Sequence, residues 1–292
     1  MKREVFVLLV ILFYTFFASN FVKSQDNQAQ EQPYESEQMI LQDSGDRIFY
    51  CAFSHNDYWR RRPLFDALSF GFNCVEADLW LIDGDLYVAH DKREIKKERI
   101  FENMYLKPLA ERIKNNGGKV YTDSKKPFFL MVDCKTSGEE MYPVLKKIME
   151  PYKELFCSVE GGIYKEGAVL LFLSGDRPLE TLPEETNRFV FLDGRVNDLE
   201  KGISYDLMPV ISNNYGEYFS WKGEGEMPEK ELQKMREIIS QTHKEGKLLR
   251  WWGAPSTKTF RQLLIKEGVD LIGTDNLEQL YDVLKEYPVD EL

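Results

Sequence analysis

Short apolar runs alternate with longer amphipathic segments along the chain. The apolar runs are rich in β-branched and aromatic residues, which is typical of strands. Several are apolar nearly throughout, as expected for strands that helices cover on both faces. The pattern predicts eight strands, at residues 48–54, 74–82, 128–134, 168–174, 189–193, 207–212, 247–252 and 269–274.

Helical patterns fill most of the gaps between these strands. They are expected at residues 63–72, 139–152, 229–246, 258–268 and 277–287. Pro63 suits the first turn of the first helix, and Gly246 and Gly268 are placed to end two others. Eight β/α units in roughly 250 residues predict an α/β fold, a single-domain TIM (β/α)8 barrel with its active site at the C-terminal strand ends. A doubly wound open sheet is the alternative, but no GxGxxG or GxxxxGK[ST] loop supports it.

The N-terminal segment does not fit the barrel pattern. Lys2 and Arg3 precede an uncharged run from Val5 to Val22, and the sequence VKSQ that follows suits a cleavage site. These features predict a signal peptide over residues 1–24, and therefore export to the periplasm or the extracellular space. An uncleaved membrane anchor is the alternative, because the run is nearly long enough to span a bilayer.

Residues 25–45 are rich in Gln, Glu, Asp and Ser, which predicts a flexible tether. The barrel is then expected over residues 46–292, without stable membrane insertion once the signal is removed. The formal net charge of −11 argues against nucleic acid as a partner or substrate, so any phosphate chemistry must be local. The four cysteines show no CxxC spacing and are expected to be buried as small hydrophobic residues.

Unusual polar residues fall at the predicted C-terminal ends of the first three strands. Side chains alternate across a strand, so Glu76 shares a face with Asp78, and Asp133 shares one with Lys135. His55 follows the first strand directly. These strands are neighbours in a barrel that winds in sequence order, so the five side chains are expected to converge.

A second histidine is expected to reach this place through a hairpin. The segment LWLIDGDLYVAHD has an Asp-Gly turn at residues 83–84, which returns His90 toward the second strand. A strict two-residue turn would set His90 opposite Ala77, whereas a three-residue loop or one bulge would set it opposite Asp78. A role for His90 in the site requires the register that sets it opposite Asp78.

Together these residues supply three carboxylates, two imidazoles and one ammonium group. Glu76, Asp78 and Asp133 cannot all stay ionised in one cleft without compensation, which a hard divalent cation, Mg²⁺ or Ca²⁺, provides. Two histidines beside that ion suit the roles of general base and general acid. Lys135 adds a positive charge for an anionic transition state. The set predicts a metal-dependent phosphoryl-transfer site.

Each of these signals alone has an ordinary structural explanation. A histidine at a strand end is most often structural, and an ExD pair is often a solvated face; the combination favours a site. His243 is expected to favour a helix C-terminus and to take no part. A TIM-barrel glycosidase that uses two carboxylates and a catalytically silent binding module remain as alternative functions.

The order of the motifs is distinctive: His55, then ExD and a hairpin to HD, then DxK, and finally GVDLIGTDN near the C-terminus. This order resembles the phosphatidylinositol phospholipase C-like phosphodiesterase superfamily, which includes the glycerophosphodiester phosphodiesterases and the sphingomyelinase D-type phospholipases. The stretch SHNDYWRRRPLFDAL is most similar to the altered-inheritance-of-mitochondria branch of that superfamily. The resemblance covers roughly residues 50–280.

The resemblance implies that the three carboxylates hold the metal, that the two histidines transfer protons or attack the phosphate, and that Lys135 steadies it. The DxK motif is similar to that of the sphingomyelinase D-type enzymes, whereas glycerophosphodiesterases usually have ExK, HRG and ENT elements. Asn56 stands in place of the HRG arginine, and RRRP stands where ENT is expected. Phosphodiester chemistry is therefore implied without a glycerophosphodiester being fixed as the substrate.

Five residues near the predicted strand ends are candidates for substrate binding: Asn56, Asp57, Arg60, Arg250 and Trp252. The run that contains Arg60 precedes a helix N-terminus, although a solvated basic turn explains it equally well. Trp252 shares a strand face with Arg250, and a lid over the core is its alternative role. The acidic surface favours a small soluble phosphodiester, of the glycerophosphodiester or phospholipid-headgroup type.

Overall fold

The computed structural model describes residues 47–288. The chain divides into two units, Met1–Ile40 and Leu41–Leu292, and only the second contains described residues. The predicted signal peptide and tether lie outside them. Within residues 47–288, no helix is both long enough and apolar enough to cross a membrane.

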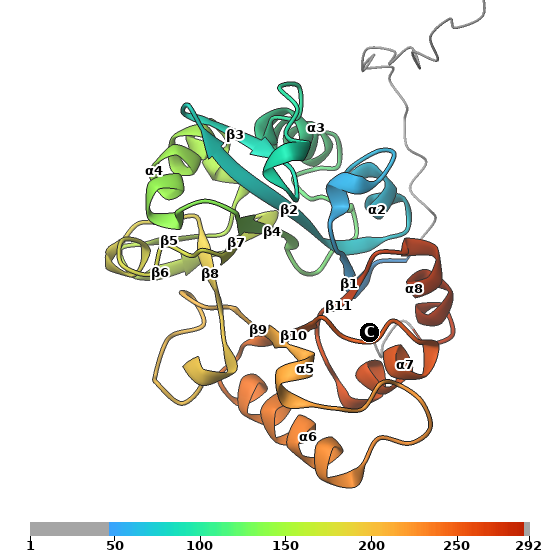
Figure 1. The fold of residues 1–292 in the computed structure, drawn as a ribbon. Coiled ribbons are helices and arrows are strands. Elements are labelled where there is room, and N and C mark those ends of the chain that lie inside the picture. The colour runs from blue at the N-terminus through green and yellow to red at the C-terminus, as the bar shows by residue number, and fades with distance from the viewer. Residues whose placement is uncertain (1–46, 289–292) are drawn as a thin grey trace, which may run out of the picture. The chain divides into compact units, whose positions relative to one another are not determined.

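Eight parallel strands surround a common centre (Figure 1). They are β1 (Phe49–Ser54), β2 (Phe72–Ile82), β4 (Phe128–Cys134), β7 (Val169–Gly175), β8 (Phe191–Gly194), β9 (Val210–Asn214), β10 (Leu248–Trp252) and β11 (Ile272–Thr274). Their order is β10-β9-β8-β7-β4-β2-β1-β11, and a parallel bridge from Arg250 to Leu271 links the two end strands. The predicted TIM barrel is confirmed, and each predicted strand overlaps an observed one.

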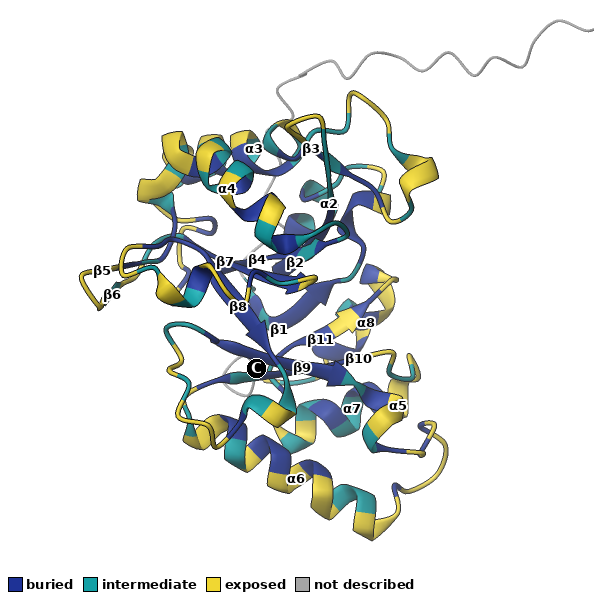
Figure 2. Ribbon diagram, turned by 60° about the vertical axis from the view of Figure 1, so that its left-hand side comes forward, coloured by how far each residue is buried: buried dark blue, intermediate teal, exposed yellow. Residues whose placement is uncertain are grey.

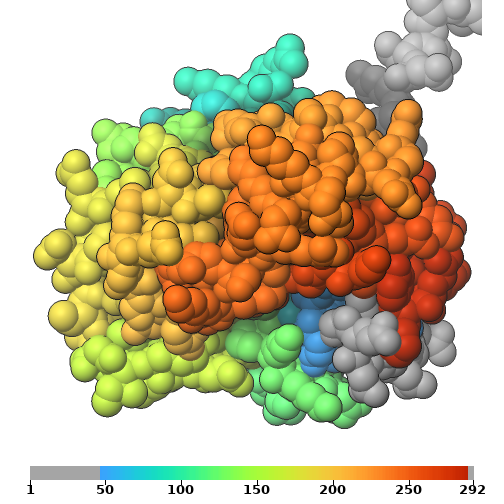
Figure 3. Space-filling model, turned by 90° about the horizontal axis from the view of Figure 1, so that it is seen from below, coloured from blue at the N-terminus to red at the C-terminus, as the bar shows by residue number. Residues whose placement is uncertain are grey.

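Helices cover the outside of the barrel. They are α2 (Phe65–Ser69), α3 (Lys107–Asn115), α4 (Gly138–Met149), α5 (Tyr215–Tyr218), α6 (Glu229–Lys244), α7 (Lys258–Glu267) and α8 (Leu277–Leu284). Seen from below, the orange surface of α5 and α6 borders the red surface of the C-terminal helices (Figure 3). The five predicted helices are present but end earlier than expected, and α3 and α5 were not predicted.

Shorter elements complete the described chain. They are the antiparallel strands β3 (Asp85–Val88), β5 (Ser158–Glu160) and β6 (Ile163–Lys165), a π-helical turn (Glu102–Leu106), and 3₁₀ turns at Asp57–Trp59, Lys92–Glu94, Glu150–Leu155, Leu182–Glu184 and Val196–Asp198. Among residues 47–288, these last two turns are the only helical elements between β7 and β9. The helix layer is therefore thinnest on that side.

Two apolar layers hold the barrel together. The inner layer fills the barrel with side chains such as Phe53, Phe129 and Phe172, and the outer layer lies between strands and helices. The barrel strands are mostly buried, and the helices expose one side (Figure 2). All four cysteines are buried, as expected, and none of them is paired. Because apolar side chains fill the interior, polar groups are left for the strand ends.

The β2–β3 hairpin has the strict two-residue turn. Asp83 and Gly84 both have positive φ, 51° and 88°, as a type I′ turn requires, and Ile82 pairs with Asp85. The prediction that His90 needs a three-residue loop or a bulge to join the site is therefore wrong. Pairing stops at Val88, and the chain then leaves the strand. The position of His90 depends on this departure, not on the register.

We expect Phe172→Ala to lower the free energy of unfolding by about 3–5 kcal/mol, because it opens a cavity in the filled barrel. Phe172 is fully buried and packs edge-on against Phe129. Urea unfolding of the full chain measures the loss. The control is Ile163→Ala, because Ile163 is 68% exposed and its truncation should change stability by less than about 0.5 kcal/mol. Equal effects for the two variants would contradict a packed interior.

Candidate active site

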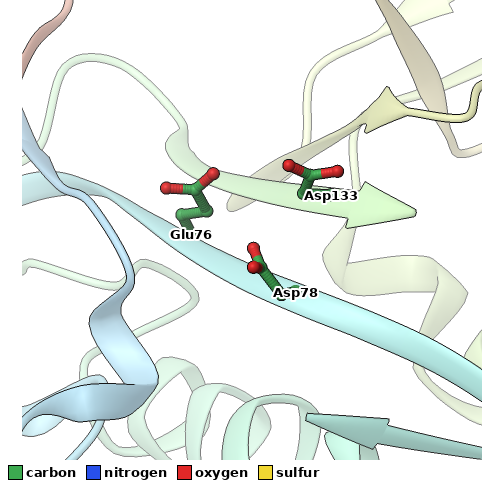
Figure 4. A group of neighbouring side chains, drawn as sticks. All are labelled: Glu76, Asp78 and Asp133. Carbon is green, nitrogen blue, oxygen red and sulfur yellow. The ribbon is translucent and has the colours of Figure 1, made fainter. Parts of the chain in front are cut away.

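Three carboxylates converge at the C-terminal ends of β2 and β4. Asp78 and Asp133 are direct register partners on these neighbouring strands, and Glu76 lies two residues earlier on the same face. One oxygen from each lies within 4.8 Å of the others. Figure 4 shows the three groups pointing toward one another. Glu76 and Asp78 are buried, while Asp133 is partly exposed.

Two cations lie beside this cluster. The ammonium of Lys135 is 2.8 Å from Asp78 Oδ2 and 3.2 Å from Asp133 Oδ2, and Arg250 Nη2 is 4.0 Å from Glu76 Oε2. Three carboxylates against two cations leave one excess negative charge when all are ionised. Burial raises the pKa of Glu76 and that of Asp133, and the nearby cations offset this only in part.

The two oxygens of Asp78 have different surroundings. Oδ2 is contacted by the Tyr58 hydroxyl at 2.8 Å, by His90 Nδ1 at 2.9 Å and by Lys135 Nζ at 2.8 Å. Oδ1 is buried and has no hydrogen-bond partner within the described chain. An unpaired buried oxygen is costly, and a hard divalent cation takes such oxygens as ligands. The donor set of Asp78 with Glu76 and Asp133 therefore fits such a cation.

A glycine keeps the space beside Asp133 open. Gly175 ends β7 with a φ of +68°, and a Cβ there would lie only 2.0 Å from Asp133 Oδ1. Any side chain at this position would also meet the Cys134 backbone. The third carboxylate can hold its orientation only because residue 175 has no side chain.

His90 lies on one side of the cluster. Its Nδ1 is 2.9 Å from Asp78 Oδ2, and the carboxylate acceptor favours a proton on that nitrogen, which leaves Nε2 for other partners. The Trp59 ring packs edge-on against the imidazole at 5.4 Å. The Ala89 N–H donates to the Asp78 carbonyl, and the bend that follows brings His90 to the Asp78 carboxylate despite the strict register.

His55 lies beside Glu76. Its Nε2 is 3.6 Å from Glu76 Oε2, and its Nδ1 is 2.7 Å from Asp275 Oδ1. Each imidazole thus has a carboxylate on Nδ1. Sequence reasoning did not identify Asp275, although its place directly after the last strand was a signal, because that strand neighbours β1 in a closed barrel.

Tyr58 was also missed. Its buried hydroxyl lies 2.6 Å from Asn56 Oδ1 and 2.8 Å from Asp78 Oδ2, so it can donate to either. Burial and the nearby carboxylates raise the pKa of this phenol. Asn56 adopts the left-handed conformation, with φ of 47°, and its N–H donates to Glu76 Oε2. Asn56, predicted to bind substrate, therefore supports two of the carboxylates.

Two other predicted substrate-binding residues are engaged by the loop after β1 and by the end of the last strand. Asp57 is fully buried, and it accepts hydrogen bonds from the Ser54 hydroxyl, the Leu64 N–H and the Tyr105 hydroxyl. The guanidinium of Arg60 donates to the backbone carbonyls of residues 55, 274 and 275. Both predictions are corrected, because these groups are already used to hold the loop after β1.

The remaining candidates differ in exposure. Arg250 is buried, with its guanidinium 4.4 Å from the centre of the Phe53 ring. Trp252, two residues further along β10, is 41% exposed at the strand end and remains open to a ligand. His243 bonds to Asp270 from α6, away from the carboxylates, as expected of a residue outside the site.

Comparisons with known proteins point to one family. Residues 44–193 match the family model described as the AIM6-like phosphodiesterase domain. The chain is 28% identical over 253 residues to the altered inheritance of mitochondria protein 6 homolog of Arthroderma benhamiae, covering 77% of this chain and 80% of that protein. It is 26% identical over 294 residues to the altered inheritance of mitochondria protein 6 of Kluyveromyces lactis, and this match covers 78% of this chain and 70% of that protein.

A solved structure is similar at lower identity. It is a glycerophosphodiester phosphodiesterase from Parabacteroides distasonis ATCC 8503, 13% identical, with a TM-score of 0.47; the match covers 82% of this chain and 99% of that one.

The prediction of export is wrong. The curated relatives are named for altered inheritance of mitochondria, which are organelles inside the cell, and not for an exported protein. The run from Val5 to Val22 on which the prediction rested lies outside the described residues.

We expect Asp57 to make stability fall as the pH rises. Burial raises its pKa from 3.8 to about 6, so the folded state holds a proton that the unfolded state releases between these values. Relative to wild type, Asp57→Asn should gain about 3 kcal/mol of unfolding free energy between pH 3.5 and pH 7. Urea unfolding across this range measures the gain. Asp282→Asn, at an exposed position, is the control, and parallel curves for Asp57→Asn and wild type would contradict the assignment.

Proposed function

Because the chain belongs to the AIM6-like phosphodiesterase domain family and is a phosphoric diester hydrolase, we propose that it cleaves a small phosphodiester with a divalent cation and two histidines. The observation that carries the proposal is the buried, unpaired Oδ1 of Asp78, set among three carboxylates with His55 and His90 close by. A metal ligand and two proton-transfer groups then meet at one strand end.

Glu76, Asp78 and Asp133 would hold Mg²⁺ or Ca²⁺ through their oxygens. When bound, the ion would offset the negative charge of the cluster and polarise a phosphoryl oxygen. The excess charge of −1 becomes +1, which matches the single negative charge of a phosphodiester. Lys135, already beside Asp78 and Asp133, would steady that anion and the charge that develops on it.

The histidines would divide the proton transfer. Asp275 orients His55 through Nδ1, so that Nε2 either accepts a proton from the attacking hydroxyl or attacks the phosphorus itself. Asp78 orients His90 through Nδ1, so that Nε2 would protonate the leaving alkoxide. The two roles require one neutral and one protonated imidazole at the start of the reaction.

The substrate would be compact and soluble, such as a glycerophosphodiester or a phospholipid-like headgroup ester. The net charge of −11 disfavours long polyanions. A glycosidase is disfavoured, because its two carboxyl groups work about 5 Å or more apart and need no lysine between them. Here Lys135 bridges two carboxylates that belong to one tight cluster.

We expect activity on a phosphodiester panel to disappear on exhaustive chelation and to return with Mg²⁺ or Ca²⁺. Glu76→Gln, Asp78→Asn and Asp133→Asn should each lower kcat/KM at least about 100-fold, since each removes a ligand. Asp85→Asn, in the exposed hairpin, is the matched control. Undiminished turnover without metal would refute the cation requirement. Faster cleavage of phospholipid vesicles than of soluble diesters would refute the substrate class alone.

His55→Ala and His90→Ala should each lower kcat by about 10²–10⁴, the usual contribution of a general acid or base. The third histidine gives the control: His243→Ala should keep wild-type activity. Retention of more than a tenth of the activity by either site variant would exclude the two-histidine mechanism.

A further inference from the structure

A polar layer continues around the mouth of the barrel beyond the carboxylate cluster. Ser174 on β7 is the register partner of Asp133, and Ser212 on β9 is the partner of Arg250. Asp193 on β8 lies between them. Each of the three lies two residues beyond an apolar side chain of the barrel interior, so all face inward. No step of the proposed reaction uses them.

The Asp193 carboxylate fixes an arginine at this mouth. It is fully buried and accepts hydrogen bonds from the hydroxyls of Ser174 and Ser212 and from Arg195 Nη1 at 2.8 Å. Arg195 also donates to the Gly194 carbonyl at 2.8 Å. The serines hold the carboxylate, and the carboxylate holds the guanidinium at the end of β8.

A second arginine lies beside the first. Arg177 donates to the Asp193 carbonyl at 2.5 Å, and both guanidinium groups are partly buried. Burial and the charge of Arg195 lower the pKa of Arg177, which reflects two cations held close together. The nearby Asp198 is occupied by Lys201 at 3.2 Å and by the Arg195 N–H at 2.9 Å. Arg195 therefore pairs with the Asp193 carboxylate while Arg177 bonds only to its backbone carbonyl, and the two arginines and Lys201 outnumber the carboxylates of Asp193 and Asp198.

These arginines have donors to spare. Each guanidinium has five N–H groups. Within the described chain, the hydrogen bonds of Arg177 involve Nη1 alone, and those of Arg195 involve Nη1 and a long contact of 3.5 Å from Nη2 to Ser174. A guanidinium with free donors, fixed in a partly buried mouth, is suited to a carboxylate or phosphate.

We propose that Arg177 and Arg195 form a subsite for a second anionic group, carried by the substrate on the alcohol side of the scissile ester. The inference rests on the proposed function, because it assumes a phosphate bound at Asp133. Arg195 lies one to two strand spacings from that carboxylate, roughly 5–10 Å. A diester whose alcohol bears a carboxylate, as in a serine ester, spans this distance.

Binding and cleavage are tested separately. Binding to the full chain in Mg²⁺ is measured by calorimetry for phosphoserine and phosphoethanolamine. The two compounds differ by one carboxylate, and both are phosphomonoesters, so neither contains a phosphodiester that the enzyme could cleave. Hydrolysis is measured for the glycerol diesters of the same two compounds. Wild type should favour the serine compound about ten- to hundredfold in Kd and in kcat/KM, as expected for charged hydrogen bonds.

Two variants remove the preference by different routes. Arg177→Met loses only a bond to a backbone carbonyl among the contacts above, and Arg195→Lys keeps the ion pair with Asp193 but loses the planar fork. Both should bring the serine preference below about threefold. Arg236→Met is the matched control, because this arginine pairs with Glu267 on the helix layer and its loss should leave the preference intact.

The two hypotheses fail in different ways. Equal binding of the two monoesters, or a preference that persists in both site variants, would overturn the subsite. If both diesters are cleaved alike, the subsite fails and the phosphodiesterase proposal stands. If neither is cleaved while the binding preference depends on the two arginines, the subsite stands and the proposed reaction fails.

Discussion

The organisation of the strand-end site depends on crowding like charges at the ends of two neighbouring strands. Parallel pairing fixes Asp78 beside Asp133, so their repulsion cannot be relieved by moving apart. Lys135, Tyr58 and His90 all contact one oxygen of Asp78, which directs the other oxygen toward the remaining carboxylates. The proposed cation would complete the arrangement, and the same contacts orient the residues that would move protons.

The loop after β1 supplies the second constraint. Asn56 takes a left-handed conformation there, which lets its N–H reach Glu76 while its side chain meets Tyr58. Arg60 joins the loop to the end of the last strand, because it donates to the carbonyls of Thr274 and Asp275 as well as to that of His55, so the placement of His55 depends on closure of the barrel. The buried Asp57 carboxyl also anchors this loop through its hydrogen bonds, and its burial raises the pKa of that group.

Sequence reasoning recovered what depends on local pattern. Apolar runs located the strands, and alternation placed Glu76 with Asp78 and Asp133 with Lys135 on shared faces. It failed where contacts join distant segments. Asp275 meets His55 only through closure of the barrel, and His90 reaches Asp78 by a bend that no register argument contains.

The charge of a residue, taken alone, also led to wrong predictions of substrate binding. Asp57 and Arg60 are charged residues beside a predicted catalytic histidine, yet their partners are backbone groups and buried hydroxyls that the sequence does not reveal. The export prediction failed for a related reason: an apolar run after two basic residues fits more than one role, and the pattern cannot say which.

The residues of the proposed reaction and those of the proposed subsite come from different parts of the barrel. The carboxylates, histidines and lysine lie on β2 and β4 and in the segments that follow β1, β3, β4 and β11. The two arginines follow β7 and β8, where the described chain has only short 3₁₀ turns. Segments without a packed helix tolerate insertions and replacement more readily than covered ones. In this layout, the residues proposed to recognise the substrate could change during evolution while the residues proposed to break the bond stay the same.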